Sequence, residues 1–134
     1  MYRVLIIDDE KFIRKSIRNR INWEKYGFSV AAEAGNGAEA IRIMSEITPH
    51  LIIVDIRMPV MDGLAFIKEA RKKFPKSIYV IMSAYSDFEY ARRAMQLGVA
   101  EYVLKPIEEE EMERILEEAA YRLNNCLLYT SDAA

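Results

Sequence analysis

Five polar residues of this sequence follow short apolar runs, and their side chains comprise three carboxylates, one hydroxyl and one amine. They are Asp8, Asp9, Asp55, Ser83 and Lys105. The apolar runs before them have the length and composition of strands that a parallel sheet buries on both faces. Functional groups in such sheets gather just beyond the carboxyl ends of the strands. We therefore predict that the five side chains meet at one edge of a sheet.

Together these groups have the composition needed for phosphoryl transfer to a carboxylate. Clustered carboxylates repel one another unless a cation neutralises them, and oxygen ligands without histidine or thiolate favour magnesium. A carboxylate can attack phosphorus and form an aspartyl phosphate. We predict Asp55 as this nucleophile, with Asp8 and Asp9 as ligands of Mg²⁺. Lys105 would contact the phosphoryl group, and the hydroxyl of Ser83 would donate a hydrogen bond to it.

Each of these residues also has a purely structural interpretation when it is taken alone. A pair of aspartates after a strand often caps the next helix. Asp55 alone would serve to cap the following loop, and Ser83 alone would bond to nearby backbone. The acidic run 108–111 is typical of a solvated helix start rather than a metal site. The joint occurrence of the five residues at four strand ends favours the functional interpretation.

The elements that must position these residues alternate between strand-like runs and segments of helical periodicity. This order is typical of an α/β fold with a parallel sheet, and we count five strand and helix pairs. We expect the first helix to place Phe12, Ile13, Ile17 and Ile21 on its inner face. The fourth helix is expected to begin at a capping box, Ser86 to Glu89, and to end at Gly98 in a left-handed conformation.

Length and composition limit the classes of protein that remain possible. With 134 residues the chain suits one domain, and a net charge of -2 gives no basic surface for nucleic acid. One cysteine, Cys126, and one histidine, His50, argue against disulfide frameworks and zinc sites. No apolar run reaches the roughly 20 residues that cross a bilayer, and no signal-peptide pattern is present. We expect a cytoplasmic protein.

Four motifs stand together in one order and spacing: VLIIDDE, LIIVDIRMPVMDG, YVIMSAYSD and EYVLKPI. In these motifs, residues 1–125 resemble the receiver domain of bacterial two-component response regulators. The resemblance implies a flavodoxin-like, doubly wound (βα)5 fold with a parallel five-stranded sheet in the order 2-1-3-4-5. It also implies a signalling switch that a sensor histidine kinase phosphorylates on Asp55, and not an enzyme that turns over other substrates.

The same resemblance implies a magnesium site and two positions that tune the switch. The backbone carbonyl of Arg57 would join Asp9 and Asp55 as ligands of Mg²⁺, while Asp8 assists, partly through water. Arg57 and Tyr85 flank the site at positions thought to set the lifetime of the phosphoryl group.

Four further residues receive roles from the resemblance. Ser83 and Tyr102 would form the switch pair that responds to phosphorylation. Lys105 would contact the phosphoryl group and precede a cis peptide bond to Pro106. Phosphorylation would promote a homodimer through the fourth helix, the fifth strand and the fifth helix. We expect no contact of this chain with a membrane.

Two features concern the protein beyond this domain. The sequence from Ile21 to Phe28 is similar to the subgroup that is fused to an AraC-type helix-turn-helix domain, which would bind DNA and regulate transcription. Residues 126–134, CLLYTSDAA, read as the translation of a transposon-type sequencing adapter. We therefore expect a native receiver domain over 1–125, a tail over 126–134 that is not native, and an effector domain that this chain lacks.

Two other functions compete with the switch. Phosphatases of the haloacid-dehalogenase type also use an aspartate nucleophile and magnesium, with a general acid two residues later. Arg57 stands at that spacing after Asp55, whereas Glu10 stands there after Asp8. The second alternative is a receiver-like scaffold that binds a partner and never takes phosphate.

Overall fold

The computed structural model describes the backbone of residues 1–58, 60–84 and 88–133, and the side chains of these ranges up to residue 125. The strands are β1 (Tyr2–Ile7), β2 (Phe28–Ala34), β3 (Leu51–Asp55), β4 (Ile78–Ser83) and β5 (Glu101–Leu104). The helices are α1 (Lys11–Arg20), the short 3₁₀ helix η1 (Glu24–Tyr26), α2 (Gly37–Ile47), α3 (Gly63–Lys73), α4 (Phe88–Gln96) and α5 (Glu109–Ala133).

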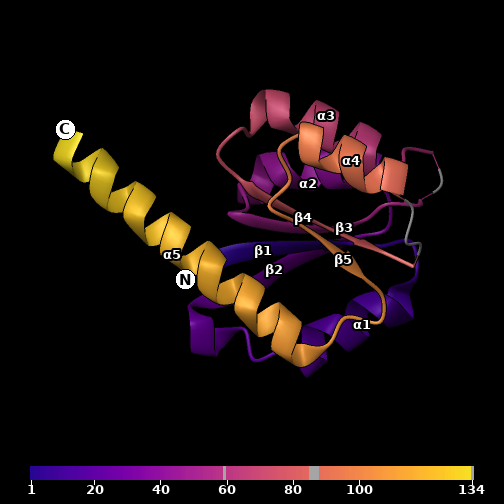
Figure 1. Ribbon diagram of the computed structural model, residues 1–134, viewed down its shortest axis with the longest axis horizontal. Helices are drawn as coiled ribbons and strands as arrows, with labels where there is room; N and C mark the ends of the chain where they lie inside the picture. The colour runs from indigo at the N-terminus through magenta and orange to yellow at the C-terminus, as the bar shows by residue number, and fades with distance from the viewer. Residues whose placement is uncertain (59, 85–87, 134) are drawn as a thin grey trace.

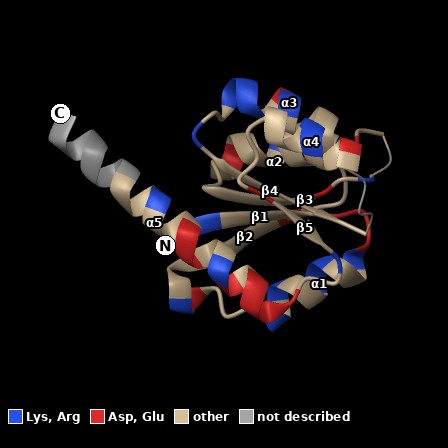
Figure 2. Cartoon of the chain, viewed as in Figure 1, with Lys and Arg blue, Asp and Glu red and all other residues tan. Residues whose placement is uncertain are grey.

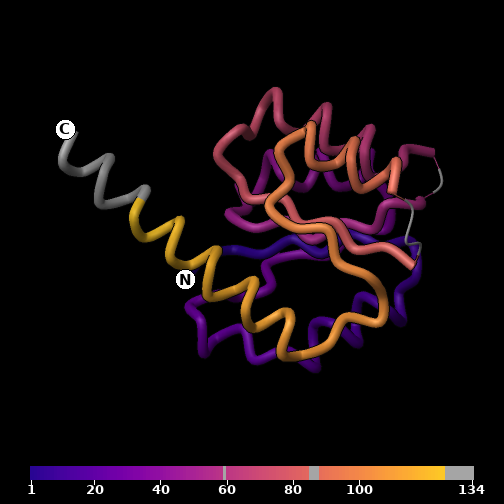
Figure 3. Tube along the Cα trace, in the orientation of Figure 1, coloured from indigo at the N-terminus to yellow at the C-terminus, as the bar shows by residue number. Residues whose placement is uncertain are grey.

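The strands form one parallel sheet in the order β2-β1-β3-β4-β5, which confirms the predicted fold. The chain starts in the interior of the sheet, moves outward to β2 and returns past β1 to β3 (Figure 3). The carboxyl ends of β1 and β3 are therefore neighbours at the point where the order of the strands in the sheet reverses. In open α/β sheets this reversal is where ligands bind.

Helices cover both faces of the sheet, and two separate apolar cores result. Helices α1 and α5 lie on one face, and α2, α3 and α4 lie on the other (Figure 1). Alternate residues of one strand point into different cores, as Ile6 and Ile7 of β1 do. Since both faces are covered, the strands can be apolar almost throughout, as their sequences are.

Helix α1 corrects one prediction. Ile17 is buried and Ile13 packs against the same core, but the Phe12 side chain is 82% exposed. Successive residues of a helix are rotated by about 100°, so Phe12 lies off the stripe that Ile13 and Ile17 share. The expectation that Phe12 faces inward was therefore wrong.

Two helix ends show local capping, at Asn36 and at Gly98. The Asn36 side chain accepts a hydrogen bond from the Glu39 backbone N–H (2.9 Å) and caps α2. Gly98 follows α4 with a φ of 83°, in the left-handed region predicted for it. The capping box predicted at Ser86 lies partly outside the described residues.

Helix α5 continues to Ala133, so its backbone marks no boundary at Asn125. That residues 126–134 are not native stays a prediction. In the part of the chain that the structure describes, no helix combines the length and apolarity of a membrane span.

His50 joins two strands at the edge of the sheet opposite the predicted site. Its Nδ1 atom accepts a hydrogen bond from the backbone N–H of Arg3 (3.0 Å). Burial, followed by the charge of Arg3, lowers the pKa of His50. The folded domain thus favours neutral His50, because a protonated Nδ1 can no longer accept the bond.

We expect His50 to make the domain less stable in mild acid. Its contribution to stability is present above the unfolded pKa of about 6.5 and is lost as the pH falls below it, because the unfolded chain then binds the proton more readily. In His50→Asn the amide oxygen still accepts from Arg3 but does not titrate. Urea unfolding measures the free energy of unfolding at pH 7.5 and at pH 5.5. It should decrease less between the two pH values in the variant than in the native domain, and equal decreases would contradict this account.

Candidate functional site

The carboxyl ends of β1 and β3 bring three carboxylates together, as predicted. Asp55 is the last residue of β3, and Asp8 follows β1 directly. One oxygen from each of Asp8, Asp9 and Asp55 lies within 4.8 Å of the others. Asp8 is fully buried and Asp55 is 6% exposed, whereas Asp9 is exposed to solvent. The cluster therefore has a buried floor and an open side.

The Lys105 ammonium group lies between the two buried carboxylates. Its Nζ atom is 2.9 Å from Asp8 Oδ2 and 3.3 Å from Asp55 Oδ1. The Lys105 backbone N–H donates to the Ser83 carbonyl (2.7 Å), which extends the pairing of β4 and β5 to the site. The Lys105 to Pro106 peptide bond is cis, as the family resemblance implied.

Burial and charge shift the protonation equilibria of the site. Burial, followed by the charge of Asp8, raises the pKa of Asp55 to about 6, although Lys105 opposes this shift. Burial alone lowers the pKa of Lys105, but the hydrogen bond to Asp8 and the charges of both carboxylates outweigh it, so that the pKa is raised overall. Lys105 is therefore charged, and its one ammonium group contacts two of the three carboxylates.

The three carboxylates fit a magnesium ion. In an octahedral site with metal to oxygen distances of about 2.1 Å, ligand oxygens lie roughly 3 to 4.2 Å apart, so a small contraction of the cluster suffices. All candidate ligands are oxygens, which suits a hard cation. A divalent ion would also supply the positive charge that Lys105 alone does not, and the exposed side at Asp9 leaves room for water and phosphate.

The structure describes three of the other predicted residues, Ser83, Tyr102 and Arg57. Ser83 is fully buried at the end of β4, and Tyr102 of β5 is half-buried against the core under α2, α3 and α4. Arg57, two residues after Asp55, is exposed, and its guanidinium carbon lies 5.5 Å from the centre of the Tyr90 ring. Tyr85 lies outside the described residues. No sequence signal had joined the loop after β3 to Tyr90 of α4.

The sequence of residues 4–117 matches the family model for the response regulator receiver domain. The chain belongs to the response regulator receiver family. This receiver domain is 40% identical over 118 residues to the transcriptional regulatory protein YesN of Bacillus subtilis, covering 88% of the chain and 32% of YesN. It spans 32% of YesN and 48% of a response regulatory protein of Staphylococcus epidermidis that it also matches.

Solved structures agree with this family. The receiver domain of AraT, a response regulator from Geobacillus stearothermophilus, superposes with a TM-score of 0.87 at 35% identity, covering 92% of this chain and 96% of that one. A two-component transcriptional regulator AraC from Clostridium phytofermentans has a TM-score of 0.81 at 36% identity, covering 89% and 92%.

Gly63 allows the loop after β3 to return closely to the receiver site. A Cβ atom at Gly63 would lie 2.6 Å from the Asp55 carbonyl oxygen and 2.8 Å from the Ile56 Cα, both backbone atoms that cannot turn aside. The Gly63 backbone N–H donates to the Ile56 carbonyl (2.7 Å), and Asp62 caps α3 through the Ala65 N–H (2.8 Å).

We expect Gly63→Ala to destabilise the receiver domain by about 2 kcal/mol, since the methyl group forces backbone at the end of β3 to move. Gly35→Ala is the matched control, because its Cβ would meet only side-chain atoms at 3.7 Å. Urea unfolding of both variants measures the difference. Equal stability of the two variants would show that the loop relaxes at no cost.

Proposed function

We propose that this receiver domain is a phosphorylation-dependent signalling switch, which accepts a phosphoryl group on Asp55 from a sensor histidine kinase and controls an effector. The observation that carries the proposal is the buried Asp55 carboxylate, 3.3 Å from the Lys105 ammonium and beside Asp8 and Asp9. A carboxylate so placed has a cation for the incoming phosphoryl oxygens and ligands for a metal. The surrounding groups are those that phosphoryl transfer requires.

In the proposed reaction an Asp55 oxygen attacks phosphorus, and the bond from phosphorus to the kinase histidine breaks. The electron pair of that bond returns to the imidazole nitrogen, which takes a proton from water. Lys105 and the Ser83 hydroxyl would contact the transferred oxygens. Magnesium, held by Asp8, Asp9, Asp55 and the Arg57 carbonyl, would neutralise negative charge there.

The new phosphoryl group would act through Ser83 and Tyr102. It adds a charge of roughly -1.5 to -2. One charge-assisted hydrogen bond contributes about 1.5 to 3 kcal/mol. A full population shift requires about 5.5 kcal/mol, which two such bonds nearly supply. Movement of Ser83 and inward rotation of Tyr102 would then alter the surface of α4 and β5.

That surface exposes apolar side chains and suits a second copy of the chain. Phe88 and Met95 of α4 are 78% and 57% exposed, and Leu104 of β5 is 47% exposed. Burial of these side chains between two copies would stabilise the active state further, beyond the two hydrogen bonds. Phosphorylation would therefore promote a homodimer through α4, β5 and α5. Sedimentation velocity with and without beryllofluoride and magnesium tests this, and identical profiles would exclude it.

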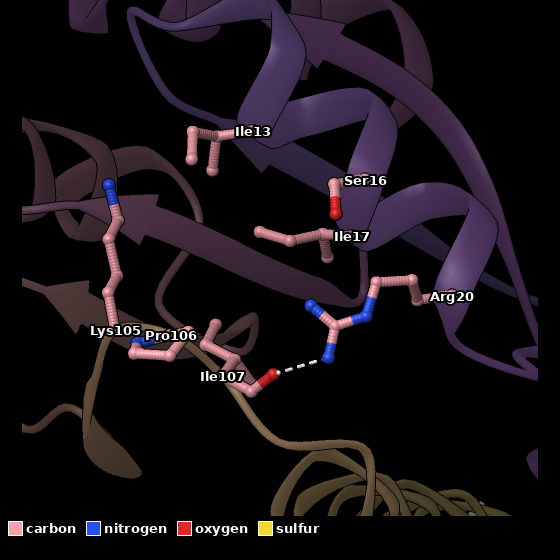
Figure 4. A pocket seen from close by; sticks show the side chains of 7 residues that line it. All are labelled: Ile13, Ser16, Ile17, Arg20, Lys105, Pro106 and Ile107. Atoms are coloured by element: carbon pink, nitrogen blue, oxygen red, sulfur yellow. Dashed lines mark hydrogen bonds between the residues drawn. The ribbon is translucent and has the colours of Figure 1, made fainter.

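The kinase would approach between α1 and the loop after β5. An open cavity of about 230 Å³ lies there beside Lys105 (Figure 4). Ile13, Ile17, Pro106 and Ile107 give it an apolar lining, and the Arg20 guanidinium donates to the Ile107 carbonyl (3.1 Å) at its edge. Basic residues gather on α1, whereas acidic residues gather on the first part of α5 (Figure 2). This lining suits a helix with apolar residues and acidic flanks.

The effector would be an AraC-type helix-turn-helix domain that regulates transcription. The likeness to the regulator from Clostridium phytofermentans and the name of YesN support this assignment. DNA would be contacted by that domain and not by this one, which carries a net charge of -2. The whole protein would act in the cytoplasm, where the kinase and DNA are both accessible.

Intact mass after incubation with acetyl phosphate tests the proposed function. We expect a gain of one phosphoryl group that requires magnesium, and no turnover of aryl phosphates. If no mass is gained, and if beryllofluoride with magnesium does not perturb the spectrum of Trp23 or Tyr102 either, the results would instead favour a scaffold that never takes phosphate. Rapid turnover of aryl phosphates would favour a phosphatase.

A further inference from the structure

We propose that Arg14 is a positioning residue for the metal site, which fixes the peptide between Asp8 and Asp9 and is itself held by Glu33. The proposal rests on the proposed function, because it assigns Arg14 to the same magnesium site. Arg14 lies on α1, and Glu33 lies on the edge strand β2. Neither residue was among those that the sequence pointed to.

Asp8 has a hydrogen-bond partner for each of its polar groups. Its backbone N–H donates to the Ala34 carbonyl (3.1 Å), and its carboxylate accepts from the Glu10 N–H (2.9 Å) and from Lys105 (2.9 Å). Its carbonyl accepts from Arg14 Nη1 at 2.5 Å. The carbonyl belongs to the peptide that joins Asp8 to Asp9, so Arg14 determines how that peptide is oriented.

Glu33 holds the other side of the Arg14 guanidinium. Arg14 Nε is 3.1 Å from Glu33 Oε1, and both side chains are largely buried, at 15% and 18% exposure. Arg18 Nη1 is 2.8 Å from the second oxygen, Oε2. Burial raises the pKa of Glu33, but the hydrogen bonds from Arg18 and Arg14 outweigh it, so that the pKa is lowered and Glu33 is charged.

This arrangement fixes the peptide, while the Glu33 carboxylate, which Arg14 shares with Arg18, offsets part of the positive charge that Arg14 brings to the site. The guanidinium would otherwise repel a divalent cation from Asp8 and Asp9 more strongly. A planar guanidinium can bind the carboxylate and the carbonyl at once, whereas one ammonium group is a single point charge. Residues that orient metal ligands typically change metal affinity about 10 to 100-fold when they are lost.

The experiment compares Arg14→Gln with Arg18→Gln. Arg18 contacts the same carboxylate but makes no contact with Asp8 among the described residues, so its variant controls for loss of an ion pair to Glu33. Magnesium affinity of each domain is measured by calorimetry with MgCl₂. We expect Arg14→Gln to bind magnesium at least 10-fold more weakly than the native domain, and Arg18→Gln less than threefold more weakly.

A second readout separates positioning from a general loss of structure. In Arg14→Gln the magnesium concentration for half-maximal phosphorylation by acetyl phosphate should rise about 10-fold, while the rate at saturating magnesium stays within about twofold of native. If Arg14→Gln does not fold, Arg14→Lys is measured in its place. Its magnesium affinity is expected to fall by more than the threefold limit set for Arg18→Gln and by less than the 10-fold expected for Arg14→Gln.

The outcomes separate this inference from the function on which it rests. If the native domain binds no magnesium, the proposed function and the inference both fail. If the native domain binds magnesium and Arg14→Gln binds it as tightly as Arg18→Gln does, only the inference is overturned.

Discussion

Asp55→Asn will gain no phosphoryl mass from acetyl phosphate under conditions in which the native domain gains one group. An amide has no anionic oxygen to attack phosphorus, so the effect is a complete loss and not a slower reaction. Asp62→Asn is the matched control, because it removes a carboxylate from the same loop while asparagine caps α3 equally well. Phosphorylation of Asp55→Asn at the native rate would place the reactive carboxylate elsewhere, with Asp9 the first to examine.

The same substitution is expected to stabilise the domain in the absence of magnesium. The pKa of Asp55 is raised from 3.8 to about 6 in the folded state. A raised folded pKa contributes stability that is complete below the unfolded pKa of about 4 and is lost as the pH rises through about 6. Asparagine resembles the protonated carboxyl group at every pH, so the variant avoids this loss.

Urea unfolding in EDTA measures the difference. At pH 8 we expect Asp55→Asn to be more stable than the native domain by about 2 kcal/mol, and at pH 4 we expect the two to be nearly equal. Saturating magnesium should reduce the difference at pH 8, since the metal favours the ionised carboxylate. A variant that is less stable than the native domain at pH 8 would show that the Lys105 ion pair outweighs the burial of Asp55 and the repulsion from Asp8.

Lys105→Met will have the second large effect, a loss of roughly 2 to 3 kcal/mol of stability at pH 8 without magnesium. The substitution leaves two buried carboxylates with no neighbouring cation, and breaking a buried pair by removing one partner is strongly destabilising. Protonation of Asp55 relieves part of this cost, which places the expected value below that of an ordinary buried pair. Lys72→Met is the control, because its ion pair with Glu69 is exposed and contributes little.

Saturating magnesium should offset most of the stability that Lys105→Met loses. The ammonium group lies where it competes with a divalent ion for Asp8 and Asp55, so its removal should tighten magnesium binding. Calorimetry with MgCl₂ measures this affinity, and unfolding in saturating magnesium should recover most of the lost stability. If Lys105→Met binds magnesium more weakly than the native domain, the lysine helps to arrange the ligands instead of competing with the metal.

Much of the site could be predicted because its signals are local in the sequence. Apolar runs followed at once by Asp8, Asp55 and Lys105 predict parallel strands, and such strands bring their carboxyl ends to one edge. Gly98 marked the end of a helix through backbone chemistry that involves only its neighbours. These are the features on which prediction and structure agree.

Contacts between distant segments could not be predicted in the same way. The helical pattern predicted that Arg14 faces solvent, whereas its side chain is only 15% exposed, and nothing in the spacing of Arg14 or Glu33 joined either to Asp8. The bond from Arg14 to the Asp8 carbonyl depends on how α1 lies across β2. Phe12 was misplaced for a related reason, since small errors in the rotation of a short helix move a residue from core to solvent.

The sequence by itself determined the order of strands and helices, and with it the edge at which the acidic and basic groups collect. The tertiary structure decided how the charges are shared there: Lys105 contacts Asp8 and Asp55 together, and the pKa of Asp55 rises to about 6. The periodic spacing of apolar residues is a property of residues close together in the sequence, and so the sequence alone reveals it. Burial and the distances between charges belong to the packed domain, because they arise only when segments far apart in the sequence meet.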